Sequence, residues 1–267
     1  MRRVVFNQKG GVGKSTIASN LAAIGAQRGL RTLVVDLDPQ ANTTRYLLGA
    51  EAADALPEDA GSAGFFDQSL KFTLREGTDG FLVESPYEHL HVMPASGRLD
   101  ELHAKLESRY KIYKLRKALE ALDGQYDAIW IDTPPSMNFY TRSALIAAQR
   151  CLIPFDCDDF SRRALYGLLE QVQELRADHN EELEVEGIVV NQFQSRARLP
   201  GELVQALIDE GLPVLEPFLG ASVKIRESHQ LARPMIHLDP GHKLTGEYVA
   251  LFDRLTAAPA GRRKARR

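Results

Sequence analysis

Short apolar runs alternate along the chain with longer segments in which apolar residues recur with a helical period. Runs typical of buried strands occupy residues 4–7, 32–36, 90–93, 128–132, 151–155, 187–191 and 214–219. Helical segments occupy residues 15–28, 99–122, 138–149, 162–178, 200–210 and 241–255. Strands joined by helices predict right-handed crossovers and parallel pairing, and strands without a polar face predict a sheet covered on both sides. The pattern predicts an α/β fold: a doubly wound, mostly parallel sheet with helices on both faces.

Residues 50–88 interrupt this alternation. They lack a clear period and contain several glycine and proline residues, so we expect a variable, loop-rich insertion with one short helix near residues 65–70. A chain of 267 residues is of ordinary size for one α/β domain. We therefore expect a single domain over residues 1–257, which includes the insertion, and a flexible basic tail at residues 258–267.

Charge is unevenly distributed. The net charge is −3, yet the last six residues carry five positive charges. The rest of the chain is acidic overall, so affinity for nucleic acid has to come from a local basic patch. The tail is either a solubilising end or an arm that contacts phosphates. No apolar run approaches the ~20 residues of a membrane helix, and the first strand begins too early for a cleavable signal, so a cytoplasmic protein is expected.

A glycine-rich run separates the first strand from the first helix. It reads Lys9, Gly10, Gly11, Val12, Gly13, Lys14, Ser15 and Thr16. Glycines allow backbone N–H groups to curl around an anion, and the following helix adds its positive N-terminal end. In such loops the lysine before the hydroxyl residue reaches the β- and γ-phosphates, and the hydroxyl binds Mg²⁺. The run predicts that residues 9–16 bind a nucleotide, with Lys14 on its phosphates and Ser15 on the metal.

A second lysine, Lys9, lies inside the loop. Gln8 occupies the position of the first glycine in the generic motif. A lysine at this place can fold back onto its own nucleotide or reach the nucleotide of a partner subunit. The residues alone leave both arrangements open.

Polar side chains follow several of the expected strands. Asp36 and Asp38 follow one strand and Asp132 ends another, so they lie at carboxyl ends, where open α/β sheets bind ligands. Phosphoryl transfer needs Mg²⁺ held by Ser15 and an acidic strand-end residue, and a group that orients the attacking water. Asn191 ends a further strand, where its amide either pairs with the adenine edge or caps a turn.

These segments together resemble one family. The run at residues 9–16, the sequence DLDPQ at residues 36–40 and the sequence DTPPS at residues 132–136 are similar to motifs of the ParA/MinD family of deviant Walker A P-loop ATPases. The residues Asn7 and Gln8, which precede Lys9, resemble those of the ParA branch of this family. Weaker likenesses in later segments extend the resemblance over most of the chain.

The resemblance implies roles in catalysis. Asp38 positions or activates the attacking water. Lys9 crosses a dimer interface to contact the partner's phosphates, so Asp38, Lys9 and Lys14 form the implied catalytic set. The nucleotide implied is ATP, and the reaction is its hydrolysis to ADP and phosphate.

The resemblance also implies how Mg²⁺ and the base are held. Ser15 binds the metal directly, and Asp36 and Asp132 hold it through water. Asn191 contacts the adenine. The implied cofactors are therefore ATP and Mg²⁺.

Members of this family bind DNA without sequence specificity, through basic residues that a nucleotide-driven dimer aligns. The residues that match are Arg196, Arg198, Lys224 and Arg226. The chain departs from the family pattern at Gly220, where DNA-binding relatives often carry arginine. The implied partners are a second copy of the chain with ATP, nonspecific double-stranded DNA and a ParB-like activating protein, with no membrane partner and a nucleoid-associated location.

The expected function is slow, partner-stimulated ATP hydrolysis in plasmid or chromosome partition, or in positioning a cargo on the nucleoid. The alternative is a nucleotide switch that acts only through a protein partner, without DNA. A membrane-docking relative would need a bulky amphipathic helix after Leu255, and an iron–sulfur relative would need cysteines spaced more widely than Cys151 and Cys157. A metabolic kinase is disfavoured by Lys9 and by the lack of an obvious acceptor site.

Overall fold

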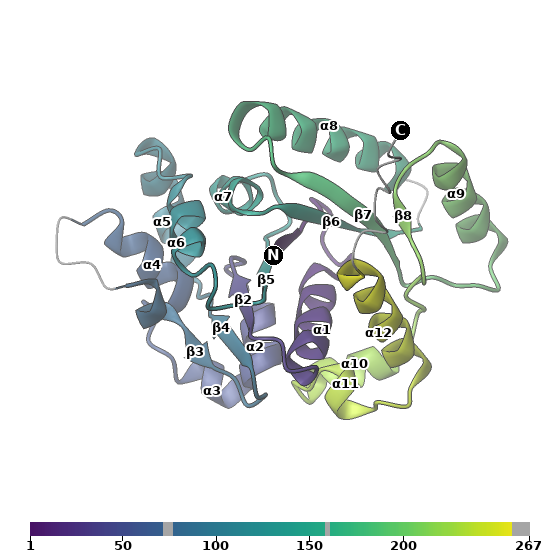
Figure 1. The fold of residues 1–267 in the computed structure, drawn as a ribbon, viewed down its shortest axis with the longest axis horizontal. Helices are drawn as coiled ribbons and strands as arrows, with labels where there is room; N and C mark the ends of the chain where they lie inside the picture. The colour runs from purple at the N-terminus through teal and green to yellow at the C-terminus, as the bar shows by residue number, and fades with distance from the viewer. Residues whose placement is uncertain (72–76, 158–160, 258–267) are drawn as a thin grey trace, which may run out of the picture.

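One twisted sheet runs through the middle of the molecule. The computed structural model describes residues 1–71, 77–157 and 161–257. Within these ranges eight strands lie in the order β3-β4-β2-β5-β1-β6-β7-β8 (Figure 1). All neighbouring pairs are parallel except the edge pair of β3 and β4. The strands are β1 (Arg2–Val5), β2 (Thr32–Asp36), β3 (Val83–Glu84), β4 (Leu90–Met93), β5 (Ala128–Asp132), β6 (Arg150–Asp156), β7 (Glu184–Asn191) and β8 (Val214–Leu215).

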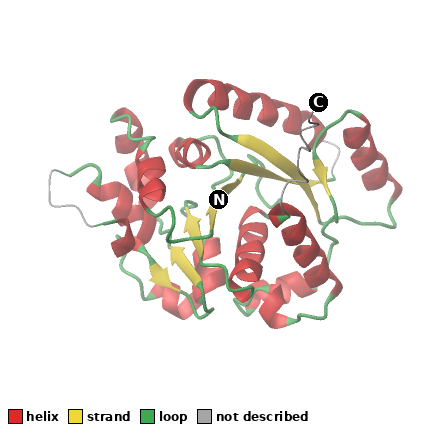
Figure 2. Cartoon of the chain, viewed as in Figure 1, coloured by secondary structure: helices red, strands yellow, loops and turns green. Residues whose placement is uncertain are grey.

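Helices cover both faces of this sheet, as Figure 2 shows in red against the yellow strands. One layer contains α1, α2, α11 and α12, and the other contains α4 to α9. No helix in the described ranges is long and apolar enough to cross a membrane. The helices are α1 (Lys14–Gln27), α2 (Asn42–Leu48), α3 (Ala50–Asp54), α4 (Gly61–Gln68), the 3₁₀ helix η1 (Thr78–Phe81), α5 (Arg98–Ser108), α6 (Lys114–Ala121), α7 (Phe139–Ala147), α8 (Ser161–His179), α9 (Arg198–Asp209), α10 (Lys224–Gln230), α11 (Met235–Leu238) and α12 (Lys243–Thr256).

Alternate residues of each central strand pack into two separate hydrophobic cores, one on each face of the sheet. Val4 of β1 and Ile131 of β5 face the layer that contains α7 and α8. Val5 and Trp130 face the layer that contains α1 and α12. Because successive side chains of a strand point to opposite faces, a strand covered on both sides is apolar along most of its length. The buried polar exceptions have partners, as Arg3 of β1 has in Glu186. This arrangement confirms the predicted doubly wound α/β fold.

The expected long helix at residues 99–122 is wrong, because the chain forms two helices there, α5 and α6. Tyr110 adopts φ 51° between them. The Tyr110 N–H donates to the Glu107 carbonyl and the Lys111 N–H to the Leu106 carbonyl, at 3.0 and 3.3 Å. This pairing ends many helices, and glycine normally occupies its left-handed position. A tyrosine there gives the sequence no visible stop signal.

The insertion is more ordered than expected. It contains α3, α4, η1 and β3, whereas the sequence predicts only one short helix there. Two of its glycines serve close packing in α4. A Cβ on Gly61 would lie 2.1 Å from the Pro94 carbonyl oxygen, and one on Gly64 would lie 1.8 Å from that of Asp59. Gly61 and Gly64, which suggest a loop in the sequence, therefore lie where another backbone segment comes too close for a side chain.

Four other differences are three unexpected helices and one shortened strand. The helix α2 follows DLDPQ directly and was not expected, and neither were α10 and α11. The strand expected at residues 214–219 is only the two residues of β8, with Pro217 close behind it. Pro217 lacks the N–H that a further ladder bond would need. The basic tail at residues 258–267 lies outside the described residues.

The strand order brings three connections to one edge of the sheet. β1 lies between β5 and β6, and β2 lies on the far side of β5. Asp36 at the end of β2 is directly opposite Asp132 at the end of β5, and Val5 of β1 is opposite Asp132 from the other side. The glycine-rich run, DLDPQ and DTPPS therefore leave the sheet together, at the edge where doubly wound sheets bind ligands.

The start of α7 allows a test of local stability. The Asn138 side chain accepts hydrogen bonds from the backbone N–H groups of Tyr140 and Thr141, at 3.0 and 3.1 Å. Asn138→Ala removes this cap, so we expect the free energy of unfolding to fall by about 1 kcal/mol in a urea titration. Asn138→Ser keeps an acceptor and should remain close to the wild type. An alanine variant as stable as the serine variant would contradict the capping role.

Candidate nucleotide site

The glycine-rich run forms a loop whose shape only glycine accepts readily. Gly11 has φ 77° and Gly13 has φ 93°, in the left-handed region that residues with a Cβ rarely occupy. Gly13 precedes α1, and its carbonyl accepts from the Ile17 N–H at 2.9 Å. A Cβ on Gly13 would also lie 2.3 Å from Nδ2 of Asn191. Both backbone conformation and space therefore require glycine at this position.

The front of the loop is attached to the neighbouring strand β6. Asn7 donates to the Pro154 carbonyl at 2.7 Å, and its Oδ1 accepts from the Lys9 N–H at 2.9 Å. The Lys9 ammonium lies 2.6 Å from Oδ2 of Asp156, the last residue of β6. The structure thus places Lys9 on a carboxylate of its own chain.

Lys14 points into the centre of the loop. Its side chain is buried, and its Nζ donates to the Lys9 carbonyl at 3.0 Å. Burial lowers the pKa of Lys14, while the charges of Asp132 and Asp38 act in the opposite direction. A buried cation beside a ring of backbone N–H groups is a strong attractor for an anion.

Asp36 and Asp132 lie behind the loop and are inaccessible to solvent. Burial, with the charge of Asp132 second, raises the pKa of Asp36 to about 8. Burial also raises the pKa of Asp132 to about 6, and hydrogen bonds from Ser15 and Thr43 oppose this increase. Within the described ranges no three histidine, cysteine or acidic side chains cluster to hold a metal ion. A cation here would need the Ser15 hydroxyl and oxygens of a ligand besides these carboxylates.

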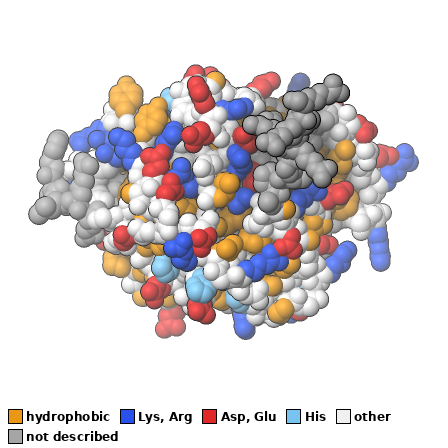
Figure 3. Space-filling view, in the orientation of Figure 1, with side chains coloured by type: hydrophobic (Ala, Val, Ile, Leu, Met, Phe, Trp, Pro, Cys, Tyr) orange, Lys and Arg blue, Asp and Glu red, His pale blue; other side chains and the backbone are white. Residues whose placement is uncertain are grey.

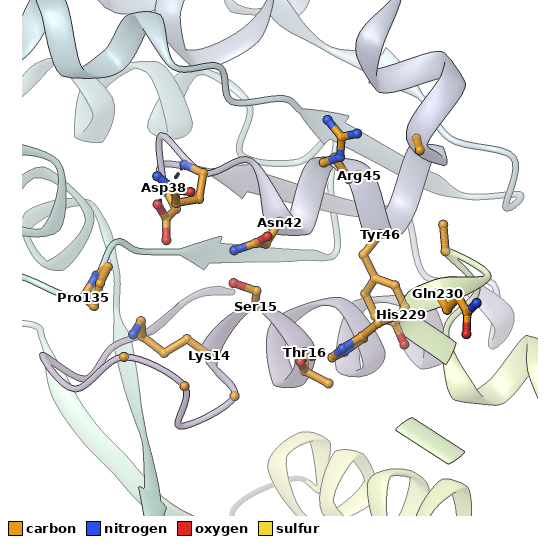
Figure 4. A pocket seen from close by; sticks show the side chains of 16 residues that line it. Lys14, Ser15, Thr16, Asp38, Asn42, Arg45, Tyr46, Pro135, His229 and Gln230 are labelled. Carbon is orange, nitrogen blue, oxygen red and sulfur yellow. Dashed lines mark hydrogen bonds between the residues drawn. The ribbon is translucent and has the colours of Figure 1, made fainter. Parts of the chain in front are cut away.

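Asp38 faces the loop across an open cavity. The cavity measures about 610 Å³ and is lined by Gly10, Lys14, Ser15 and Asp38 among others. In Figure 4, Asp38 comes from the upper side, and Lys14 and Ser15 come from the loop and helix below it. One Asp38 oxygen accepts from the Gln40 N–H at 3.0 Å. A group bound over the loop would lie between the Lys14 ammonium and the Asp38 carboxylate.

A second cavity of about 410 Å³ continues around the loop. It shares Gly11, Gly13, Thr16 and His229 with the first, and Asn191 also lines it. Asn191 donates to the Val12 carbonyl at 2.9 Å. Asn191 therefore holds the loop in place, and its Oδ1 has no role in that bond. Of residues 9–16, Lys9 and Val12 do not line either cavity, and Val12 is buried.

Two segments that carry the four basic candidates lie side by side. The bridge between Phe193 and Gly220 brings them together. Gly220 donates its N–H to Glu247 at 2.7 Å, and a Cβ on Gly220 would lie 3.3 Å from a Glu247 carboxylate oxygen, so an acidic side chain lies beside this position.

The charge of these candidates is partly compensated. Arg198 pairs with Glu202 at 2.5 Å, and Lys224 pairs with Glu227 at 2.9 Å. Arg196 lines one cavity and Arg226 another, and both cavities are lined by the segment from Gly220 to Ser222. On the face drawn in Figure 3, basic and acidic side chains are interspersed. The structure brings these residues to one region but does not make it uniformly positive.

The sequence reasoning missed several polar residues of this site. Thr43 and Thr44 donate to Asp132 and Asp36, each at 2.7 Å. His229 lies 2.9 Å from the Thr16 hydroxyl, through Nε2. Two adjacent threonines a few residues after DLDPQ are a signal that could have been used, since hydroxyl groups near buried carboxylates can donate hydrogen bonds to them. Nothing in the local sequence indicates His229.

The sequence is similar to known proteins over most of its length. The sequence profile of the family described as AAA domain matches residues 3–185. The chromosome partitioning protein ParA of Myxococcus xanthus is 32% identical over 251 residues, which cover 92% of this chain and 84% of that protein. The sporulation initiation inhibitor protein Soj of Bacillus subtilis is 30% identical over 257 residues, which cover 95% of this chain and 97% of Soj.

Solved structures share the whole fold. A cobyrinic acid a,c-diamide synthase from Mycobacterium smegmatis, with bound ATP analog and magnesium, is 27% identical with a TM-score of 0.80, and the match covers 96% of this chain and 94% of that one. The cell division ATPase MinD of Pyrococcus furiosus is 19% identical with a TM-score of 0.73, covering 95% and 98%, a likeness of fold alone. With the profile match and the identity to ParA over most of both chains, this chain belongs to the ParA/MinD family of P-loop ATPases.

Proposed function

We propose that this protein is an ATP-dependent dimerising ATPase that binds DNA nonspecifically in its ATP state. It would act in plasmid or chromosome partition, or in positioning a cargo on the nucleoid, in the cytoplasm. The observation that carries the proposal is the opposition of Lys14 and Asp38 across one cavity, which Ser15 also lines, with two buried carboxylates nearby. Binding of a phosphate chain and activation of water both need such an arrangement.

The two connected cavities suit the two ends of ATP. The phosphates would lie on the backbone of residues 10–16 with Lys14 in contact, and the base would lie in the second cavity beside Asn191. Asn191 keeps Oδ1 and one amide hydrogen for the adenine edge, because its bond to Val12 uses only the other hydrogen. Ser15 would hold Mg²⁺ directly, and Asp36 and Asp132 through water. The metal would neutralise the charge of the phosphates.

Asp38 is the group best placed to orient the attacking water. Its backbone N–H donates to Asp36 at 3.1 Å, which fixes the start of its loop. One of its carboxylate oxygens accepts from Gln40, and the other is available to accept from a water in the cavity. Slow turnover fits a water held by a single carboxylate, and a ParB-like partner would accelerate it.

Dimerisation would move Lys9 away from Asp156 and onto the phosphates of the partner's nucleotide. Lys9 directly precedes Gly10, which lines the cavity. An ammonium group exchanges one anionic partner for another at modest cost, whereas a neutral side chain at this place would gain nothing from a second nucleotide. Without ATP the carboxylate would hold Lys9 on its own subunit.

DNA binding would use Arg196, Arg198, Lys224 and Arg226 from both subunits of the closed dimer. The neighbouring segments that carry them support this surface. Each subunit alone offers few uncompensated cations there, because Glu202 and Glu227 pair with two of them. Affinity for DNA would therefore require the cations of two subunits together. Because ATP would drive dimerisation, DNA binding would depend on ATP.

Binding of ATP and its hydrolysis should separate on mutation of Asp38. Asp38→Ala removes the water-orienting carboxylate and no phosphate contact, so we expect unchanged ATP affinity and loss of turnover by at least ~100-fold. Lys14→Ala is the contrasting variant and should lose ATP binding itself. Turnover by phosphate release and affinity by fluorescent nucleotide titration distinguish the two. Retained turnover in Asp38→Ala would remove Asp38 from this role.

DNA binding should appear only with ATP and should decrease steeply with salt. In a gel shift with plasmid DNA we expect binding with ATP and none with ADP, and a decrease of about 10³-fold between 50 and 200 mM salt if some six phosphates are contacted. Arg226→Ala should flatten the salt slope, and Arg226→Lys should restore it. Lys9→Ala should remain monomeric with ATP in sedimentation and should not shift DNA. ATP-dependent dimers with absent or salt-insensitive DNA binding would instead favour a switch that acts only on a protein partner.

The buried carboxylates predict how stability without Mg²⁺ depends on pH. The pKa of Asp36 is raised from 3.8 to about 8, so between these pH values the folded chain holds a proton that the unfolded chain releases. The free energy of unfolding should therefore fall as pH rises from about 4 to 8. Asp36→Asn mimics the protonated acid at every pH, so urea titrations of this variant at pH 5.5 and 8 should show a smaller decrease. Equal slopes would contradict the shift.

A further inference from the structure

Thr43 is a buried hydroxyl that neither the expected motifs nor the cavity lining includes. It is the second residue of α2 and has no solvent exposure. Its hydroxyl donates to Oδ2 of Asp132 at 2.7 Å, across 89 positions of the sequence. The other Asp132 oxygen accepts from the Thr133 N–H at 3.0 Å. Loss of the Thr43 hydroxyl would leave a buried carboxylate oxygen without this donor, which is costly in a dry environment.

The beginning of α2 lacks the usual means of starting a helix. The residue before it, Ala41, has φ 53° and provides no side-chain cap. A non-glycine residue in this conformation persists only when its surroundings hold it there. Here the surroundings are the two carboxylates, because Thr43 binds Asp132 and the Thr44 N–H and hydroxyl both donate to Asp36.

The loop that carries Asp38 is therefore fixed at both ends. Before it, the Asp38 N–H donates to Asp36. After it, the first turn of α2 is attached to Asp132 and Asp36 through Thr43 and Thr44. Residues 38–41 between these points form one tight turn, with the Ala41 N–H on the Asp38 carbonyl at 2.8 Å. Any displacement of Thr43 from Asp132 would tilt this turn relative to the glycine-rich loop.

We propose that Thr43 is a positioning residue of this ATPase, whose hydroxyl orients the Asp132 carboxylate toward the metal position and fixes the Asp38 loop against the phosphates. The inference rests on the proposed function, since it assigns Thr43 to the same hydrolytic site. Thr43 does not line the cavity, so it would act through Asp132 and the Asp38 loop. Groups that hold metal-binding carboxylates in orientation commonly change metal affinity or activity when removed.

The two threonines differ in how much structure depends on each. Thr44 makes three bonds, two to Asp36 and one from the Ala95 N–H at 2.9 Å, and so attaches α2 to the chain after β4. Thr43 donates only to Asp132 and lies 3.5 Å from the Ser19 hydroxyl. Removal of the Thr43 hydroxyl should therefore leave α2 in place and change mainly the orientation of Asp132.

The test compares Thr43→Val, which keeps the shape and removes the hydroxyl, with Thr43→Ser, which keeps the hydroxyl. We expect Thr43→Val to reduce ATP turnover by about 10- to 100-fold and to raise by about tenfold the Mg²⁺ concentration needed for tight binding of a fluorescent ATP analogue. Thr43→Ser should recover most of both. Thr32→Val is the matched control, because Thr32 is equally buried on β2 but bonds to the Leu30 carbonyl at the opposite end of the strand.

Wild-type turnover and Mg²⁺ requirement in a folded Thr43→Val variant would overturn the assignment. The same would follow if Thr43→Ser were as defective as Thr43→Val, because the hydroxyl would then be irrelevant. If Thr43→Val does not unfold cooperatively in urea, Thr43→Ala replaces it with the same expected shifts. A wild-type protein that binds no ATP in the presence of Mg²⁺ would overturn the proposed function itself, whereas a functional wild type with an insensitive Thr43 overturns only this inference.

Discussion

Two carboxylates inside the sheet constrain the rest of the site. Asp36 and Asp132 face each other on adjacent strands, with no access to water. Such a pair is tolerated only when donors and a counter-charge surround it. The donors come from the Asp38 loop and the start of α2, and also from Ser15 and the Thr133 N–H. Lys14 supplies positive charge from the glycine-rich loop. The hydrogen bonds and the charge that stabilise Asp36 and Asp132 therefore hold the glycine-rich loop and the Asp38 loop on opposite sides of one cavity.

The same constraint explains why the strand order matters. Parallel strands place all their carboxyl ends at one edge, and the order β2-β5-β1-β6 puts the three functional connections next to each other there. Asn7 and Asn191 then tie the loop after β1 to β6 and β7, the strands on its other side. The site depends on the sheet for its precision, because its polar groups sit at strand ends or in the first turns of helices that pack on both faces.

Much of the fold and of the site could be predicted from the sequence. The features that could not be predicted have identifiable physical causes. Short apolar runs predict the sheet, since strands covered on both faces are mostly apolar, and the glycine spacing predicts the phosphate loop. Tyr110 adopts a left-handed conformation, and Gly61 is required by close packing against another segment. Both features depend on tertiary contacts, which a local sequence pattern does not reveal. Contacts such as Lys9 with Asp156 join residues far apart in sequence and become visible only when the strand order is known.

The position of Lys9 provides the most direct test of the proposed ATPase cycle. Its ammonium lies on Asp156 of its own chain, and the cycle requires it to move to a partner's phosphates when ATP is bound. The most direct measurement is a crystal structure of the Asp38→Ala variant with ATP and Mg²⁺, since this variant should retain unhydrolysed nucleotide. The expected result is two subunits closed over two nucleotides, with the Lys9 ammonium of each on the phosphates of the other. A nucleotide-bound monomer, or a dimer in which Lys9 still pairs with Asp156, would contradict it.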